Sequence, residues 1–196
     1  MADMVLGPFL WERMIRAVEK VRERLLRTVA ALEHAGIPYA VAGGNAVASW
    51  VSRVDESAVR NTPNVEILIR RTDLDRAVSA LTAAGFVYWS TASNTQFLDG
   101  ASGKPRDAVR VFIAGEKAGT EDFEAAPDVA MSELAKGFLV LNLEALVRME
   151  LAAFHTTNHV RLRDLIEVGL LDASWLDRLP PELARRLQEL LDTPDG

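Results

Sequence analysis

The sequence of 196 residues contains no cysteine and only three histidines. The absence of cysteine excludes disulfide bridges and zinc sites built on thiolates, and it is consistent with the cytoplasmic location that we expect. No apolar run approaches the roughly 20 residues that a membrane-spanning helix needs, so we expect no membrane partner. The first residues, Met1 to Trp11, lack the basic start and apolar stretch of a signal peptide, which supports the same expectation.

Positive charge is also scarce. The chain has 22 Lys and Arg against 28 Asp and Glu, for a net charge of -6. Binding to nucleic acids usually depends on a basic surface, so this composition argues against a nucleic-acid partner while leaving room for a local basic groove. The 49% hydrophobic content is ample for a core, and the length suits one compact unit.

Hydrophobic periodicity predicts a mixed α/β (α+β) fold in which a mixed sheet is flanked by helices and followed by a C-terminal helical region. We expect three parts, an N-terminal helix packing on the core (1–36), a central α/β part (37–141) and the helical region (142–196). The predicted helices are Phe9 to His34, Asn45 to Val54, Asp73 to Ala84, Leu143 to Phe154, His159 to Val168, Leu171 to Trp175 and Glu182 to Leu191. The predicted strands are Tyr39 to Ala42, Val65 to Ile69, Phe86 to Trp89, Thr95 to Leu98, Ala108 to Ile113 and Phe138 to Leu141.

The first helix carries one apolar stripe at spacings of three and four residues. We expect this stripe to pack into the core, with a dimer face as the alternative. Its members are Trp11, Met14, Ile15, Val18, Val21, Leu25, Val29 and Leu32.

A set of residues in the central part carries the functional signal. Gly43-Gly44 opens a helix, and Arg60, Thr62 and Asn64-Val65-Glu66 lead into a buried strand. This pattern resembles the signature of the nucleotidyltransferase superfamily, the type with a palm like that of DNA polymerase beta. The helix Leu143 to Met149 resembles the one that follows the palm in minimal, toxin-type bacterial members.

The resemblance implies an enzyme that binds a nucleoside triphosphate with Mg²⁺ and transfers the nucleotide to an acceptor that the sequence does not identify. Gly43, Gly44 and Asn45, with Arg60 and Thr62, would contact the phosphates of a nucleotide or another phosphate-containing small molecule. The family holds its metals with two aspartates two residues apart and a third on a neighbouring strand.

This sequence departs from the family at the metal-binding positions. Asn64 and Glu66 replace the first two aspartates, and Arg110 stands where the third carboxylate is expected. Glu150 replaces a lysine that is frequent in relatives. A neutral amide is a poor ligand for Mg²⁺. We therefore expect lost or weak activity, with Glu66 as the surviving metal ligand if activity persists and no cofactor otherwise.

Several alternatives follow from these departures. One is a binding module without catalysis, for a nucleotide, another anion or a protein. A surviving metal site would need a second carboxylate, for which the nearest candidates in sequence are Asp55, Glu56, Asp107 and Glu116. We also hypothesise that Glu66 and Arg110 form an ion pair, in which the guanidinium replaces the charge of a metal.

Two further groups of residues each have two interpretations. His155 and His159 have the spacing of some zinc pairs, but the intervening Thr156 to Asn158 is typical of a helix break and cap. Arg148, Arg161 and Arg163 form either a basic cluster near the site or a solvated helical face.

Overall fold

The structure is a computed structural model that describes residues 8–91 and 94–193, with side chains from residue 12 onward. Its helices are α1 (Pro8–His34), α2 (Gly43–Val51), α3 (Leu74–Ala83), α4 (Leu143–Ala153), α5 (Thr156–Glu167) and α6 (Pro181–Asp192). Its strands are β1 (Tyr39–Ala42), β2 (Val65–Ile69), β3 (Val87–Thr91), β4 (Asn94–Leu98), β5 (Val109–Ile113), β6 (Ser132–Ala135) and β7 (Phe138–Leu141). Short 3-10 turns lie at Glu56–Ala58, Arg71–Asp73, Pro105–Asp107 and Ala173–Arg178.

The strands form one mixed sheet in the order β3-β4-β5-β2-β1-β7-β6. At its centre β2 runs antiparallel to β1 and parallel to β5, while β1 is parallel to β7. The mixed α/β fold with flanking helices is therefore confirmed. The strand β6, which lies at one edge of the sheet, was not predicted.

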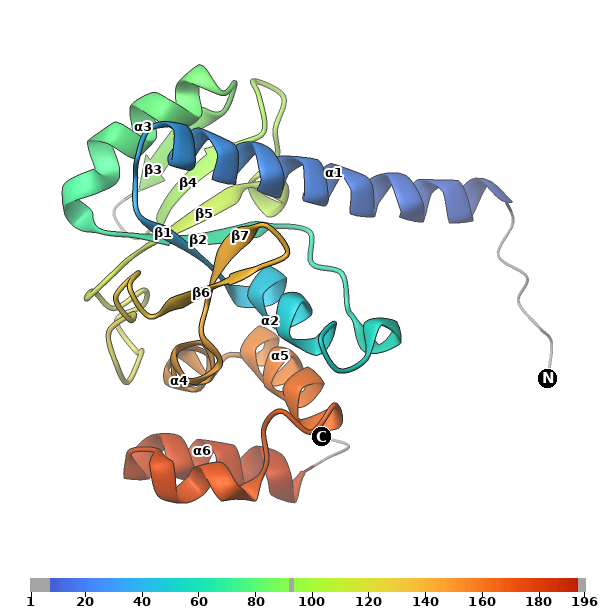
Figure 1. The fold of residues 1–196 in the computed structure, drawn as a ribbon, viewed down its shortest axis with the longest axis vertical. Coiled ribbons are helices and arrows are strands. Elements are labelled where there is room, and N and C mark those ends of the chain that lie inside the picture. Colours follow the sequence, from blue (N-terminus) through green and yellow to red (C-terminus); the bar gives the residue numbers. More distant parts are fainter. Residues whose placement is uncertain (1–7, 92–93, 194–196) are drawn as a thin grey trace.

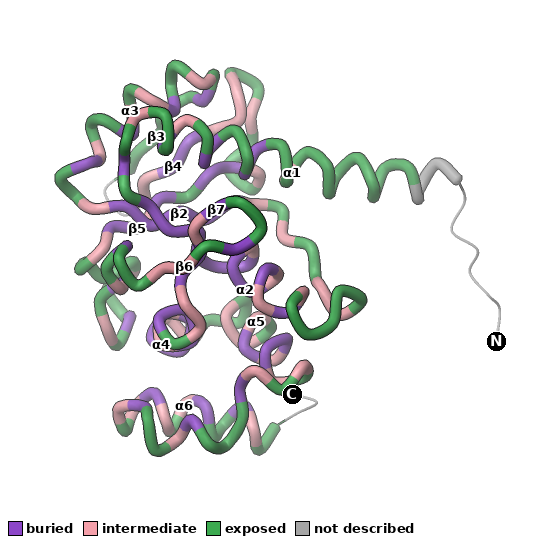
Figure 2. Tube along the Cα trace, in the orientation of Figure 1, coloured by how far each residue is buried: buried purple, intermediate pink, exposed green. Residues whose placement is uncertain are grey.

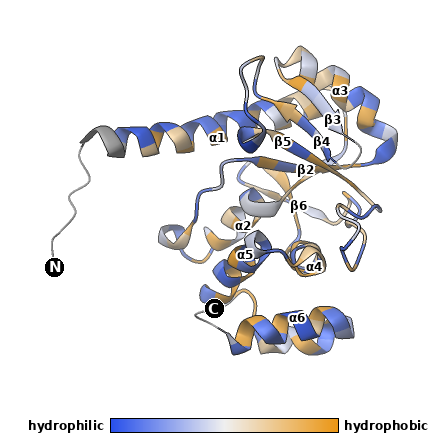
Figure 3. Ribbon diagram, turned by 180° about the vertical axis from the view of Figure 1, so that it is seen from behind, coloured by the Kyte–Doolittle hydropathy of each residue, from blue (hydrophilic) through white to orange (hydrophobic). Residues whose placement is uncertain are grey.

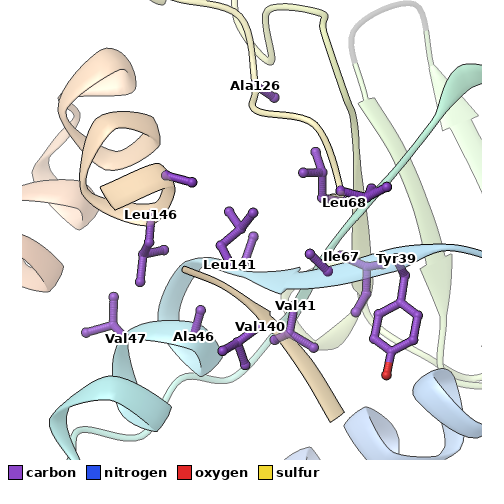
Figure 4. Close-up of a cluster of buried hydrophobic side chains, with 14 of the residues drawn as sticks. Tyr39, Val41, Ala46, Val47, Ile67, Leu68, Ala126, Val140, Leu141 and Leu146 are labelled. Carbon is purple, nitrogen blue, oxygen red and sulfur yellow. The ribbon is translucent and has the colours of Figure 1, made fainter. Parts of the chain in front are cut away.

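Helices cover both faces of the sheet. Figure 1 shows α1 and α3 on one side and α2, α4, α5 and α6 on the other, with α6 outermost. The central strands are buried because apolar side chains project from both of their faces. Figure 4 shows side chains of β1, β2 and β7 meeting Ala46 and Val47 of α2 and Leu146 of α4.

The apolar stripe of α1 is only partly in the core. Leu25, Val29 and Leu32 are buried, but Met14 is 48% exposed and Val18 is 40% exposed. Figure 2 and Figure 3 show the first half of α1 extending away from the body with little cover. A helix of 27 residues is about 40 Å long, and α1 continues past the last elements that it contacts. The expectation that the whole stripe is core is therefore wrong for its first half.

The side chain of Trp11, assigned to the stripe, lies outside the described side chains. Within the described ranges, no helix is both long enough and apolar enough to cross a bilayer. The division of the chain at 1–36, 37–141 and 142–196 stays a prediction.

Candidate functional site

Glu66 is the central residue of the predicted site. It lies in β2, pairs in register with Ala42 of β1, and is only 4% exposed. The backbone N–H of Gly44, in the first turn of α2, donates to its Oε2 over 3.2 Å. The free N–H groups and the dipole of a helix N-terminus favour an anion. The anionic group at the start of α2 in this structure is therefore the carboxylate of Glu66.

The two glycines provide the space for this contact. Gly43 has a φ of +57°, which glycine adopts without strain. A Cβ added at Gly43 would lie 1.4 Å from Oε2 of Glu66. A Cβ at Gly44 would lie 2.8 Å from the Cβ of Thr62. The Gly-Gly turn thus lets the carboxylate and the loop before β2 approach the backbone of α2 closely.

A guanidinium holds the same carboxylate from the other side. Nη2 of Arg161, on α5, lies 2.7 Å from Oε2 of Glu66, and Nη1 lies 3.3 Å from Oε1 of Glu150 on α4. The Arg161 side chain is 12% exposed, and Glu150 is 2% exposed. One cation therefore connects two buried carboxylates from different elements.

The turn between α4 and α5 brings Glu150 and Arg161 together. Phe154 ends α4 in the left-handed conformation with a φ of +51°, and α5 begins at Thr156. Asn158, in the first turn of α5, donates from Nδ2 to Oε2 of Glu150 over 2.6 Å. The sharp reversal thus aligns an amide and a guanidinium on the same carboxylate.

Burial shifts the titration of this group. Burial raises the pKa of Glu150 from 4.5 to about 7, and the charge of Glu66 adds to this, while Arg161 and Asn158 oppose it. Burial alone would lower the pKa of Arg161, but its two carboxylate partners raise it overall. Arg161 therefore stays charged, while Glu150 titrates near neutral pH.

The other predicted residues of the motif form a polar network around Glu66. Asn64 donates from Nδ2 to Oε1 of Glu66 over 3.4 Å, and its own Oδ1 accepts from the Thr62 hydroxyl over 3.1 Å. Asn45 donates to the backbone carbonyl of Asn64 over 2.9 Å. These contacts tie α2 to the start of β2, so Asn64 acts here as a hydrogen-bonding amide.

Arg60 joins the loop before β2 to α5. Its Nε lies 2.5 Å from Oδ1 of Asp164, whose side chain is nearly buried. Burial raises the pKa of Asp164 although the charge of Arg60 opposes the shift. This pair fixes the loop that carries Thr62 against the C-terminal helices.

The hypothesis of an ion pair between Glu66 and Arg110 is wrong. The two residues are direct neighbours in the parallel pair β2–β5 and therefore project from the same face of the sheet. Yet Glu66 pairs with Arg161, which reaches it from α5. Arg110 is exposed and, among the described residues, has no ion-pair or hydrogen-bond partner. It is thus an uncompensated cation on the face that carries Glu66.

Most of the other candidate residues predicted from the sequence make separate local contacts. Asp55 caps the turn at Glu56–Ala58, Glu116 pairs with Arg71, and Asp107 lies 3.5 Å from Arg106. His159 contacts the carbonyl of Phe154. Arg148 pairs with Glu124 and Arg163 donates to Thr193, so these two do not form a cluster with Arg161. The carboxylate that does meet Glu66 through Arg161 is Glu150, which the sequence marked only as a departure from relatives.

These elements surround a cleft with a volume of about 690 Å³. Residues of α2, the loop 60–64, β5 and the α4–α5 turn line it. Its cationic members are Arg60, Arg106, Arg110 and Arg161, and its acidic members are Glu66, Asp122 and Asp164. His155 also lies on its wall. The size is that of a small-molecule site.

The metals that the resemblance implies do not fit these residues. Glu66 is committed to Arg161 and Gly44, Asn64 is neutral, and a cation stands at position 110. Within the described part of the chain, no group of three His, Asp or Glu side chains is arranged to hold a metal ion. A divalent cation beside Glu66 would lie next to the guanidinium of Arg161, and the two charges would repel each other.

The fold has counterparts among solved structures. The antibiotic-resistance factor ANT(2'')-Ia, a nucleotidyltransferase, superposes with a TM-score of 0.54 at 12% identity, over 90% of this chain and 93% of that one. JHP933 from Helicobacter pylori gives a TM-score of 0.46 at 17% identity, over 91% of this chain and 74% of that one. No family model and no curated protein sequence matches the chain. The chain has a nucleotidyltransferase-like fold, as its motif predicted.

Proposed function

We propose that this protein binds a nucleotide or a related phosphate-bearing small molecule in the cleft, without a metal ion and without transferring it. The observation that carries this proposal is the position of Arg161 between the buried carboxylates of Glu66 and Glu150. In a two-metal transferase, two divalent cations would act at this place. Here the cation is part of the chain.

The cationic surface of the cleft supports an anionic ligand. Arg110 has no partner among the described residues, and a guanidinium binds phosphate oxygens in a bidentate manner. Arg106 and Arg60 lie on the same cleft, although each has an acidic neighbour. We assign phosphate contact first to Arg110, and additional contacts to Thr62 and Arg60, which line the same cleft, whereas Asn45 lines the groove on the other side of the loop.

Nucleotidyl transfer is the competing function, because the fold resembles that of ANT(2'')-Ia. It would require Glu66 to leave Arg161 and bind Mg²⁺ with a second carboxylate. Glu150 is the carboxylate nearest to that arrangement, since Arg161 contacts both. The two functions therefore differ in their response to Mg²⁺.

The test is titration calorimetry with ATP, GTP, CTP and UTP, each with and without Mg²⁺. We expect saturable binding that does not strengthen when Mg²⁺ is added. Replacing Arg110 by Gln removes a charged hydrogen bond to phosphate and should weaken binding by about 10-fold. The matched control is Arg13→Gln, because Arg13 is exposed on α1 and does not line the cleft.

Each other outcome has a defined meaning. Binding that depends on Mg²⁺, together with release of pyrophosphate, would replace this proposal with nucleotidyl transfer. Failure of all four nucleotides to bind would reject the nucleotide class of ligand. Equal losses in Arg110→Gln and Arg13→Gln would show that net charge, not the cleft, causes the binding.

A further inference from the structure

A second groove lies on the other side of the loop 60–63. It has a volume of about 810 Å³ and is bounded by the middle of α1, one side of α2, the segment 56–63 and the start of β7. Four residues of the loop, Arg60 to Pro63, line both this groove and the cleft. The groove is therefore adjacent to the candidate site and shares α2 with it, but α1 forms its other wall.

The walls of the groove are mainly apolar. Val18, Val21 and Leu25 of α1 face Val59 of the loop segment and Phe138 of β7 across it. Val18 is 40% exposed although it belongs to the apolar stripe of the helix. These side chains offer a surface that an apolar molecule could cover.

Cations predominate at the margin of this apolar surface. Arg22, Lys136 and Arg60 line the groove, while Glu56 is its acidic member. Arg60 is paired with Asp164, but Arg22 and Lys136 have no ion-pair partner within the described residues. In a chain with a net charge of -6, this local excess of positive charge favours an anionic group on the occupant.

We propose that this groove is a second binding site, for a small molecule with an apolar body and one anionic group. The apolar body would pack on Val18, Val21 and Phe138, and the anionic group would contact Arg22 or Lys136. An apolar wall with a few polar groups and a volume of this size is typical of small-molecule sites.

The first experiment compares two probes by titration calorimetry on the full chain: decanoate and decylammonium. We expect one molecule of decanoate per chain and binding about 10-fold tighter than for decylammonium, because the groove is cationic. Equal or stronger binding of decylammonium, or no saturable binding of decanoate, would overturn the proposal.

Variants then locate the site. Val18→Asp should reduce decanoate binding by at least ~10-fold, because it places a carboxylate in the apolar wall. The matched control is Met14→Asp, one turn away on the same exposed stripe but outside the groove, which should bind as the unmodified chain does.

Two results of these variants would overturn the proposal. If Val18→Asp and Met14→Asp lose binding equally, the probes bind the exposed stripe and not the groove. If sedimentation shows a dimer that both variants dissociate, the stripe is covered by a second copy of the chain.

Discussion

The protonation of Glu150 gives a quantitative prediction about stability. Its pKa is raised to about 7 in the folded protein, first because the carboxyl is buried and then because Glu66 is near, and Arg161 and Asn158 limit the shift. The folded state therefore binds a proton more tightly at Glu150 than the unfolded state does. Stability from this group is fully present below the unfolded pKa of 4.5 and is lost as the pH rises through about 7.

The magnitude follows from the two pKa values. The pKa of Glu150 is 4.5 in the unfolded chain and about 7 in the folded protein. Between pH 5 and pH 8, this difference lowers the free energy of unfolding by about 2 to 3 kcal/mol. Glu150→Gln removes the titration and keeps an amide of nearly the same shape. We expect the stability of the variant relative to the unmodified chain to rise by that amount over this pH range.

The assay is urea denaturation of both proteins at half-unit intervals from pH 5 to pH 8. Taking the difference between the two proteins cancels the titration of the other groups. Asp75→Asn is a suitable control, because Asp75 lies on the solvent side of α3, far from this ion-pair network in the fold. A difference between Glu150→Gln and the unmodified chain that does not change with pH would refute the reasoning, because Glu150 would then keep one protonation state throughout.

Two further predictions concern the same network. Arg161→Met leaves Glu66 and Glu150 buried without their cation and should lower the free energy of unfolding by about 3 to 5 kcal/mol, measured by thermal and urea denaturation. A loss below about 1 kcal/mol would mean that water compensates both carboxylates. Gly43→Ala should lower the free energy of unfolding by more than about 1 kcal/mol, because alanine is strained at a φ of +57° and its Cβ would displace the carboxylate of Glu66. Unchanged stability in urea denaturation would show that the turn relaxes easily.

The parts of the fold that were predicted well are those with a strong local signal. The strands β1, β2 and β7 begin and end at the predicted residues, because each is a short apolar run that is buried in the sheet. The edge strand β6 was missed, because its sequence Ser132 to Ala135 is only partly buried and lacks a regular alternation. The exposure of the first half of α1 was also missed, since periodicity shows that a stripe exists but not what covers it.

For the candidate site too, the residues with a local sequence signal were predicted and a contact between distant elements was not. Gly43, Gly44, Asn64 and Glu66 are close to one another in the structure, as the motif implied, because a turn and two neighbouring strands position them. The hypothesis that Arg110 pairs with Glu66 rests on the loss of a negative charge at one position of the motif and the gain of a positive charge at another, but the partner is Arg161. That contact depends on how α5 packs against α2 and α4, and no local pattern in the sequence specifies such packing.

The connection of Glu66, Arg161 and Glu150 also limits how this cleft can change by mutation. Introducing aspartates at positions 64, 66 and 110 would not by itself create a metal site, because Arg161 would still neutralise the carboxylates. Removing Arg161 first leaves the buried carboxylate of Glu66 without its cation and favours the protonated form of Glu150, at a cost comparable to much of the 5 to 15 kcal/mol that stabilises a typical domain. No single substitution therefore leads to a two-metal site through a stable intermediate, so an evolving chain with this network would be held in its present charge arrangement.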